Sequence, residues 1–234
     1  MISLVGKNLT AGYGGVDIIK NINLEVKQGE IVVIVGPNGA GKSTAMKALL
    51  GMLKLTDGGV SFAEDDITFM LPQDRVNLGI AFVPQTQNVF TGMSVEENLE
   101  MGGFIRSDDI RLTIEDIYNL FPILKEKRNQ NAGELSGGQR QQVAFGRALM
   151  TKPKILMLDE PTAGVSPIVM DELFSRIIEV GKTGVGILMV EQNAKQALNI
   201  ADRGYVLVNG MNSREGSGQD LLNNPEVRKS FLGG

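Results

Sequence analysis

The stretch "IVVIVGPNGAGKST", residues 31–44, passes from a short apolar segment directly into a glycine-rich loop and then into a helical pattern. Its apolar part is rich in branched residues, which is typical of a strand buried on both faces of a parallel sheet. Two later segments have the same character: "KILMLDE" at 154–160 and "VGILMVEQ" at 185–192. Helical patterns separate the three, including one that opens at Pro167. The sequence therefore predicts an α/β fold with a parallel core sheet.

Two further regions are expected around this core. Residues 22–26 alternate between apolar and polar side chains, which predicts a half-buried antiparallel strand in an N-terminal β region. From about residue 88 to 150 no comparable buried strand occurs, and capping boxes are expected at Ser94–Glu97 and Thr113–Asp116. We therefore predict one domain over residues 1–234, with a mainly helical lobe inserted at about 88–150.

The composition limits the kinds of site that this chain can carry. Its 234 residues include no cysteine and no histidine, so disulfides, thiolate metal sites and histidine metal sites are excluded. A bound metal would need oxygen ligands. The formal net charge is −4 and Lys and Arg do not cluster, which argues against a nucleic-acid partner. No apolar run suits a signal peptide or membrane helix, so we expect a cytoplasmic protein that meets a membrane only through a partner.

The glycine-rich loop satisfies the phosphate-binding pattern G-x-x-x-x-G-K-[ST] in the strand–loop–helix context that this pattern requires. Its backbone N–H groups can wrap a phosphate chain, Lys42 would neutralise the β and γ phosphates, and the Ser43 hydroxyl would bind Mg²⁺. A glycine-rich turn without a ligand is the alternative. The residues expected to contact ATP are Gly36, Pro37, Asn38, Gly39, Ala40, Gly41, Lys42, Ser43 and Thr44.

Two adjacent carboxylates, Asp159 and Glu160, follow four apolar residues at the end of a predicted buried strand. Open α/β sheets bind ligands at this end of their strands, and buried carboxylates need a compensating cation or polar substrate. We expect Asp159 to hold Mg²⁺ and Glu160 to orient or deprotonate the attacking water. A surface turn would explain one acid better than two.

The segment "LSGGQRQQVAFGRALM", from Leu135, predicts a helix whose first turn is capped by Ser136 and Gln139. An ordinary capped helix would fit this spacing equally well. However, the chain here closely resembles the ATP-binding cassette (ABC) family, whose signature motif is LSGGQ. The other family motifs follow in the same order: Tyr13 at the aromatic position, the loop at 36–44, Gln85 in "VPQ" as the Q-loop glutamine, and Asp159–Glu160 after the signature.

This resemblance covers essentially the whole chain and implies a P-loop NTPase of the ABC cassette type, with ATP and Mg²⁺ as cofactors. In the family, two cassettes pack head to tail. The signature residues of one cassette, here Ser136, Gly137, Gly138 and Gln139, then meet the γ-phosphate held by the loop of the other. Tyr13 would stack on adenine, unless it is an incidental aromatic residue in a glycine turn. Gln85 would lie at the metal with Ser43 and Asp159. A partner cassette, either a second copy or a related subunit, is therefore implied.

Two positions depart from the usual family pattern. In "VEQN", Gln192 stands where most cassettes have a switch histidine that contacts the γ-phosphate. Glutamine can still donate a hydrogen bond to a phosphate oxygen, but it does not ionise near neutral pH. We therefore expect Gln192 to sense the γ-phosphate while Glu160 acts as the base; a surface glutamine after a strand is the alternative. In "AGVSP", Ser166 replaces the usual D-loop Asp, which weakens the expectation of tight symmetric coupling.

One branch of the family shares these departures: the ATPases of branched-chain and other hydrophobic amino-acid importers. The similarity lies in "VPQTQNVFTGMSVEENLEMGGF", "VEQNAKQALNIADRGYVL" and the ending "LLNNPEVRKSFLGG". The chain is similar to the second, shorter cassette of such a pair, although this branch usually has Glu at the position of Gln85. The branch implies a different partner cassette, two membrane permeases and an external substrate-binding protein, and hence a place on the inner face of the cell membrane.

The apolar residues after Gln85 and the transported solute leave alternatives open. Val89, Phe90 and Met93 lie where family members receive a permease helix, but such residues can equally pack the lobe. The alternatives for function are a urea or short-amide importer ATPase, a soluble ABC ATPase such as one in iron–sulfur cluster assembly, and a non-enzymatic nucleotide-binding subunit.

Overall fold

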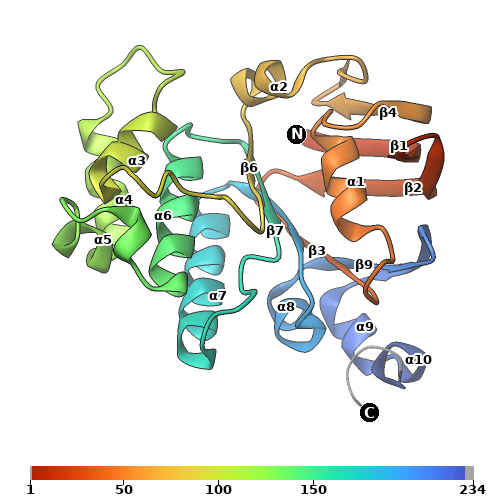
Figure 1. Cartoon of the computed structure of the whole chain (residues 1–234). Helices are drawn as coiled ribbons and strands as arrows, with labels where there is room; N and C mark the ends of the chain where they lie inside the picture. Colours follow the sequence, from red (N-terminus) through yellow and green to blue (C-terminus); the bar gives the residue numbers. More distant parts are fainter. Residues whose placement is uncertain (1, 230–234) are drawn as a thin grey trace.

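The computed structural model describes residues 2–229, so the last five residues of the ending quoted above lie outside it. Figure 1 shows three regions: an antiparallel sheet near the N-terminus, a central sheet, and a group of helices on the side away from the antiparallel sheet. In the part of the chain that the structure describes, no helix is both long and apolar enough to cross a membrane.

The central sheet has the strand order β10-β9-β3-β8-β7-β6, and all of its pairs are parallel except β9 with β10. The three predicted buried strands are confirmed as its adjacent members β3, β8 and β7, and every residue in them is buried. The pattern did not identify β6 and β9. The strands are β3 (Ile31–Val35), β6 (Ile80–Val83), β7 (Ile155–Asp159), β8 (Gly186–Val190), β9 (Arg203–Val208) and β10 (Met211–Gly216).

The second sheet is antiparallel, with the order β2-β1-β4-β5, as predicted for the N-terminal region. In its strand β2, Ile22, Leu24 and Val26 are buried while the residues between them are more exposed, which confirms the predicted alternation. The strands are β1 (Ser3–Tyr13), β2 (Val16–Lys27), β4 (Leu55–Phe62) and β5 (Asp65–Asp66).

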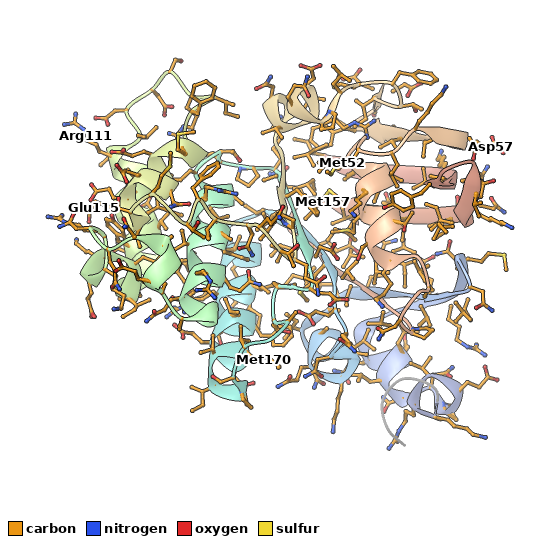
Figure 2. The ribbon with its side chains drawn as sticks, in the orientation of Figure 1. Met52, Asp57, Arg111, Glu115, Met157 and Met170 are labelled. Carbon is orange, nitrogen blue, oxygen red and sulfur yellow. The ribbon has the colours of Figure 1, made fainter. Side chains whose placement is uncertain are left out.

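The central sheet carries a hydrophobic core on each face. Along β3, Val32 and Ile34 pack towards helix α1 (Lys42–Leu49) and the antiparallel sheet, and Val33 and Val35 pack towards the helical side. Strand geometry requires this alternation, because successive side chains point to opposite faces. Figure 2 shows Met157 of β7 in the middle of the molecule, between the two sheets. Burial on both faces fixes the strands and hence the loops at their carboxyl ends.

Residues 88–150 contain helices and a short 3₁₀ turn. The capping boxes at Ser94–Glu97 and Ser136–Gln139 are both present. The box expected at Thr113–Asp116 was wrong. Helix α4 begins earlier, at Arg111, because Asp109 accepts a hydrogen bond from the Arg111 N–H at 3.0 Å. Thr113 is instead buried inside the helix.

The remaining bounds complete the description of the chain. The helices of residues 88–150 are α3 (Val95–Gly102), α4 (Arg111–Leu120), α5 (Pro122–Glu126), the 3₁₀ turn Ala132–Glu134, and α6 (Gly137–Leu149). The others are α2 (Pro72–Leu78), α7 (Pro167–Lys182), α8 (Ala194–Ile200), α9 (Gly218–Asn223) and α10 (Pro225–Val227). Helix α7 starts at Pro167, as predicted.

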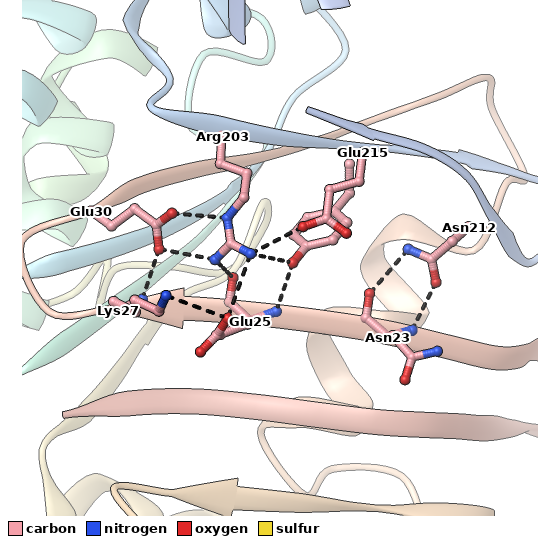
Figure 3. Close-up of polar contacts among 8 residues, drawn as sticks. Asn23, Glu25, Lys27, Glu30, Arg203, Asn212 and Glu215 are labelled. Atoms are coloured by element: carbon pink, nitrogen blue, oxygen red, sulfur yellow. Dashed lines mark hydrogen bonds and ion pairs between the residues drawn. The ribbon is translucent and has the colours of Figure 1, made fainter. Parts of the chain in front are cut away.

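A polar network around Arg203 joins the two sheets (Figure 3). The Arg203 guanidinium on β9 donates two hydrogen bonds to the Glu30 carboxylate, at 2.8 and 3.0 Å, and a third to the main-chain carbonyl of Glu25 on β2, at 3.0 Å. It also contacts Tyr205 and Glu215. Forked guanidinium–carboxylate pairs are among the stronger polar contacts in proteins. This network therefore fixes the antiparallel sheet against the central one.

Replacing Arg203 with Met is expected to lower the free energy of unfolding by about 2–3 kcal/mol, because the Glu30 carboxylate and the Glu25 carbonyl lose a charged donor. Lys should recover only part of this loss, since an ammonium group cannot make the forked contact. Urea unfolding measures both variants. Arg111→Met is the control: its pair with Asp109 involves an arginine that is 86 % exposed, so the change should stay below about 0.5 kcal/mol. A loss no larger than this control would contradict the role of Arg203.

Candidate active site

The phosphate-loop motif occupies the turn between β3 and α1. Gly36 directly follows β3, and a Cβ at this position would lie 2.2 Å from the main-chain oxygen of Leu207. Gly41 precedes α1 with φ of 91°, in the left-handed region that favours glycine. The motif therefore needs glycine at both positions to bring this backbone around the start of the helix. The loop also lines an open cavity of about 320 Å³, together with Ile18 and Glu160.

Lys42 and Ser43 begin α1 and point towards the loop and towards β7. The Lys42 ammonium is buried and donates to the carbonyls of Gly36 and Pro37, at 2.9 and 3.1 Å. Burial lowers the pKa of Lys42, while Glu160 and Asp159 act in the opposite direction. The Ser43 hydroxyl donates to Asp159 Oδ1 at 2.9 Å. Two of the three predicted Mg²⁺ ligands, Ser43 and Asp159, are thus in direct contact.

Asp159 ends β7 and is only 5 % exposed. Burial raises the pKa of its carboxyl, and the hydrogen bond from Ser43 and the charges of Lys47 and Lys42 oppose this shift. No ion pair of Asp159 closer than 4.0 Å occurs within residues 2–229. The position therefore holds a carboxylate whose ionised form is unfavourable until a cation compensates it.

Glu160 has a backbone conformation that few non-glycine residues adopt. Its φ is 49°, and its N–H donates to the main-chain oxygen of Val190 on β8 at 2.9 Å. Its carboxylate accepts a hydrogen bond from the Gln85 side chain at 2.7 Å. Backbone strain of this kind persists only where the surroundings enforce it, and it is concentrated at functional sites. The fold thus brings Gln85 and Glu160 together beside the phosphate loop.

These side chains fit a magnesium ion chemically. A hydroxyl, a carboxylate and an amide side chain, from Ser43, Asp159 and Gln85, offer the oxygen donors that Mg²⁺ prefers. Within residues 2–229, no three Asp, Glu, His or Cys residues gather into a metal cage. This arrangement suits a cation that completes its coordination with phosphate oxygens and water.

Tyr13 ends β1 and lies beside α1. The residue is 49 % exposed, and the Lys47 ammonium lies 5.9 Å from the ring centroid. Lys47 is one helical turn after Ser43, so the exposed ring lies on the same side of the molecule as the phosphate loop. This geometry leaves the ring accessible for a flat ligand, although Tyr13 itself does not line the loop cavity.

The signature residues lie apart from this cluster. Ser136 caps α6, and a Cβ at Gly138 would lie 2.5 Å from Val169 near the start of α7. Residues 136–139 do not line the cavity over the phosphate loop of their own chain. The structure therefore brings together the loop, Gln85, Asp159 and Glu160, and leaves the signature at a separate place.

Gln192 lies two residues beyond β8, the strand between β3 and β7. Val190 pairs with Ile34 on one side and with Asp159 on the other, so Gln192 follows the strand at the same sheet edge as the phosphate loop and Glu160. Its side chain is exposed. Ser166 is the residue before α7 and is also exposed, with no side-chain bond to the helix start.

Sequence reasoning missed two buried polar contacts next to this site. Glu191 is 2 % exposed and accepts hydrogen bonds from the main-chain N–H and hydroxyl of Thr162, at 3.0 and 2.8 Å. Asn88 donates to Gln141 of α6 at 2.7 Å, which ties the segment after Gln85 to the signature helix. A charged residue directly after four apolar ones was the available signal for Glu191. No comparable signal marked Asn88.

Comparisons with known proteins agree with this geometry. The sequence matches the family model described as ABC transporter over residues 19–163. It is 44 % identical to the high-affinity branched-chain amino acid transport ATP-binding protein BraG of Pseudomonas aeruginosa, over 95 % of this chain and 96 % of that protein. It is 38 % identical to the probable branched-chain amino acid transport ATP-binding protein LivF of Archaeoglobus fulgidus, over 96 % of each. It is 34 % identical to the lipopolysaccharide export system ATP-binding protein LptB of Escherichia coli, over 100 % of this chain and 98 % of that one.

Solved structures give the same result for the fold. The ADP conformation of MJ1267, an ATP-binding cassette of an ABC transporter, superposes with a TM-score of 0.86 at 32 % identity and covers 100 % of both chains. A dimeric post-hydrolysis state of the cassette MJ0796, bound to ADP and Pi, superposes with a TM-score of 0.82 at 26 % identity, over 94 % of this chain and 99 % of that one. The predicted α/β cassette fold is therefore confirmed. This chain belongs to the ABC transporter family, and it is an ATP-hydrolysing cassette of that family.

Proposed function

We propose that this cassette powers an importer of branched-chain or other hydrophobic amino acids, as one of two paired ATPase subunits. The observation that carries the proposal is its 44 % identity to BraG over nearly the full length of both chains, against 34 % for LptB. The two permeases, the external binding protein and a place on the inner face of the cell membrane belong to this proposal.

The proposed roles follow from where the groups lie. The loop N–H groups and Lys42 bind the β and γ phosphates, and Tyr13 stacks on the adenine. Ser43, Asp159 and Gln85 hold Mg²⁺, which supplies charge compensation at the transferring phosphoryl group. Glu160 orients or deprotonates the attacking water, and Gln192 donates a hydrogen bond to a γ-phosphate oxygen. The contact between Gln85 and Glu160 supports placing both at one reaction centre.

The second cassette would complete this site. Residues 136–139 form a capped helix start but do not line the cavity of their own chain, which supports their use by a partner in a head-to-tail pair. Enclosure by the partner would exclude water and strengthen the electrostatic contacts to the γ-phosphate.

A groove beside the helical segment supports the permease contact. It has a volume of about 280 Å³, and Phe90, Met101 and Phe104 are among the residues that line it. The rings of Phe90 and Phe104 are 45 % and 80 % exposed, whereas Val89 packs against the core and Met93 is half-buried. Of the three residues named from the sequence, Phe90 is therefore the one we propose for the permease contact.

ATP-dependent efflux from inside-out membrane vesicles tests the transported solute directly. The vesicle membranes carry the cognate permeases with this chain and its partner cassette. The binding protein is enclosed in the lumen, and ATP is added outside. Labelled leucine should leave the lumen in an ATP-dependent manner. ATP-dependent transport of urea or acetamide, but not of leucine, would favour the short-amide importer instead. An ATP hydrolysis rate that does not change when the permeases are present would favour a permease-independent ATPase.

Glu160→Gln should reduce kcat for ATP hydrolysis by at least about a hundredfold, because the amide cannot accept a proton from the attacking water. ATP binding should persist, since Lys42 and the loop are untouched. Steady-state hydrolysis is measured over a range of protein concentrations, with and without the partner cassette. The control, Glu64→Gln, alters a carboxylate in the turn between β4 and β5 and should leave kcat unchanged. A wild-type kcat in the Glu160→Gln variant would contradict the proposed role of Glu160 as the group that orients or deprotonates the water.

Asp159→Asn should raise the thermal midpoint of the nucleotide-free protein while abolishing Mg²⁺-dependent hydrolysis. Because the folded pKa of Asp159 lies above its unfolded value near 3.8, this group favours folding only when protonated. That contribution is lost as the pH rises through the folded pKa, so at pH 7 the ionised group costs stability. The amide removes this cost and can still accept from Ser43. Calorimetry at pH 7 measures the midpoint, and an unchanged or lower midpoint would contradict the electrostatic account.

Gln192→His should introduce a pH dependence that the wild type lacks. Histidine titrates near pH 6.5, so kcat of the variant should change through about pH 6–7 while the wild-type profile stays flat there. Gln219→His, on the exposed face of α9, controls for the mere presence of a histidine. A wild-type profile with a limb near pH 6–7 that is assignable to this chain would contradict the roles proposed for Gln192 and Glu160.

A further inference from the structure

Glu191 belongs to the segment that carries Gln192, and its carboxylate contacts the segment that carries Glu160. It is the last residue before Gln192 and only 2 % exposed. Oε1 of its carboxylate accepts two hydrogen bonds from Thr162, from the N–H at 3.0 Å and from the hydroxyl at 2.8 Å. Oε2 accepts from the main-chain N–H of Gln192 at 3.2 Å. One buried carboxylate thus bridges two loops that are 29 residues apart in the sequence.

The surroundings of Glu191 disfavour an ionised carboxylate. Burial raises the pKa of Glu191, hydrogen bonds from Thr162 lower it, and the like charge of Glu160 raises it. Within residues 2–229, Glu191 makes no salt bridge shorter than 4.0 Å. A neutral side chain would avoid this cost, but an amide has an oxygen on only one side. A carboxylate can accept on both sides, which is what donors in both loops require.

The bridge joins the backbone on both sides of the site. Glu160 has φ of 49°, and its N–H is held by Val190, the residue before Glu191. Thr162 holds the other end of this short loop onto Glu191. On the far side of Gln192, Asn193 contacts Met170 Sδ at 3.2 Å, near the start of α7 where Figure 2 labels Met170. Gln192 therefore lies between two side chains that are each attached to the segment following Glu160.

We propose that Glu191 is a positioning residue, which fixes the base Glu160 and the γ-phosphate ligand Gln192 relative to each other through Thr162 and the Gln192 backbone. The inference rests on the roles proposed above for those two residues. Because reacting groups must be held within a fraction of an ångström, a small displacement of either one lowers the rate without weakening nucleotide binding.

The first test is Glu191→Gln, assayed in the assembly in which the wild type hydrolyses ATP. The glutamine keeps the volume and satisfies either Thr162 or the Gln192 N–H, but not both. kcat should fall by about tenfold or more, while the dissociation constant for ATP stays at the wild-type value. Wild-type kcat in this variant overturns the proposal. An equal loss of ATP binding also overturns it, because the residue would then support the fold as a whole.

Thr162 provides the matched pair of variants. Thr162→Val removes the hydroxyl at constant shape and should lower kcat, and Thr162→Ser keeps the hydroxyl and should restore it. Thr183→Val is the control, since its hydroxyl bonds only to the Val180 carbonyl at the end of α7. Glu191→Gln and Thr162→Val together should be little worse than the more severe single change, because both act on one contact. Fully additive losses would overturn the shared mechanism.

Amide hydrogen exchange separates this inference from the proposed function. In Glu191→Gln, exchange should speed up in both 160–166 and 191–194 relative to the wild type, whether or not the protein turns over. Faster exchange in one segment alone overturns the bridge. If the wild type shows no hydrolysis with any partner cassette, the proposed transport function fails, and the exchange result still decides whether Glu191 couples the two loops.

Discussion

The whole site depends on the pairing of three adjacent parallel strands, β3, β8 and β7. Their register places Ile34, Val190 and Asp159 side by side, so the phosphate loop, Gln192 and Glu160 all emerge at one edge of the sheet. Both faces of these strands are buried, and a shift by one residue would expose one apolar set and bury polar groups in its place. Hydrophobic packing therefore fixes the positions of groups that carry charge.

This arrangement places ionisable groups in the protein interior, where water solvates their charges poorly. Burial shifts the pKa values of Lys42, Asp159 and Glu191 towards their neutral forms, and Lys42 uses its donors on loop carbonyls. Bound phosphates would offer Lys42 charged acceptors, and a cation would compensate Asp159. Buried charged groups of this kind are expected of a preorganised site, in which some stability is lost so that little rearrangement is needed when ligands bind.

The sequence predicted most of this arrangement, and its failures have physical causes. The three fully apolar strands and the capped signature helix were identified because each depends on a local pattern. Strand β6 was missed because four residues give little periodicity, and the Thr113 cap was wrong because Asp109 binds the helix start two residues earlier. Contacts between distant segments, such as Arg203 with Glu30, have no local signature. Residue roles at the site remain predictions of the family resemblance and of the geometry.

The same limit explains why the sequence pattern did not identify Glu191 as a buried contact. From one sequence, a glutamate after four apolar residues looks like a chain leaving the core, yet this residue is more buried than Asp159. Its side chain turns back under the loop that carries Glu160, and its neighbour Gln192 turns outwards. In the role proposed for Gln192, a glutamine has no charge to guide it towards a phosphate, so its orientation would depend on the backbone. The hydrogen bond between the Gln192 N–H and the buried Glu191 carboxylate provides such a backbone constraint.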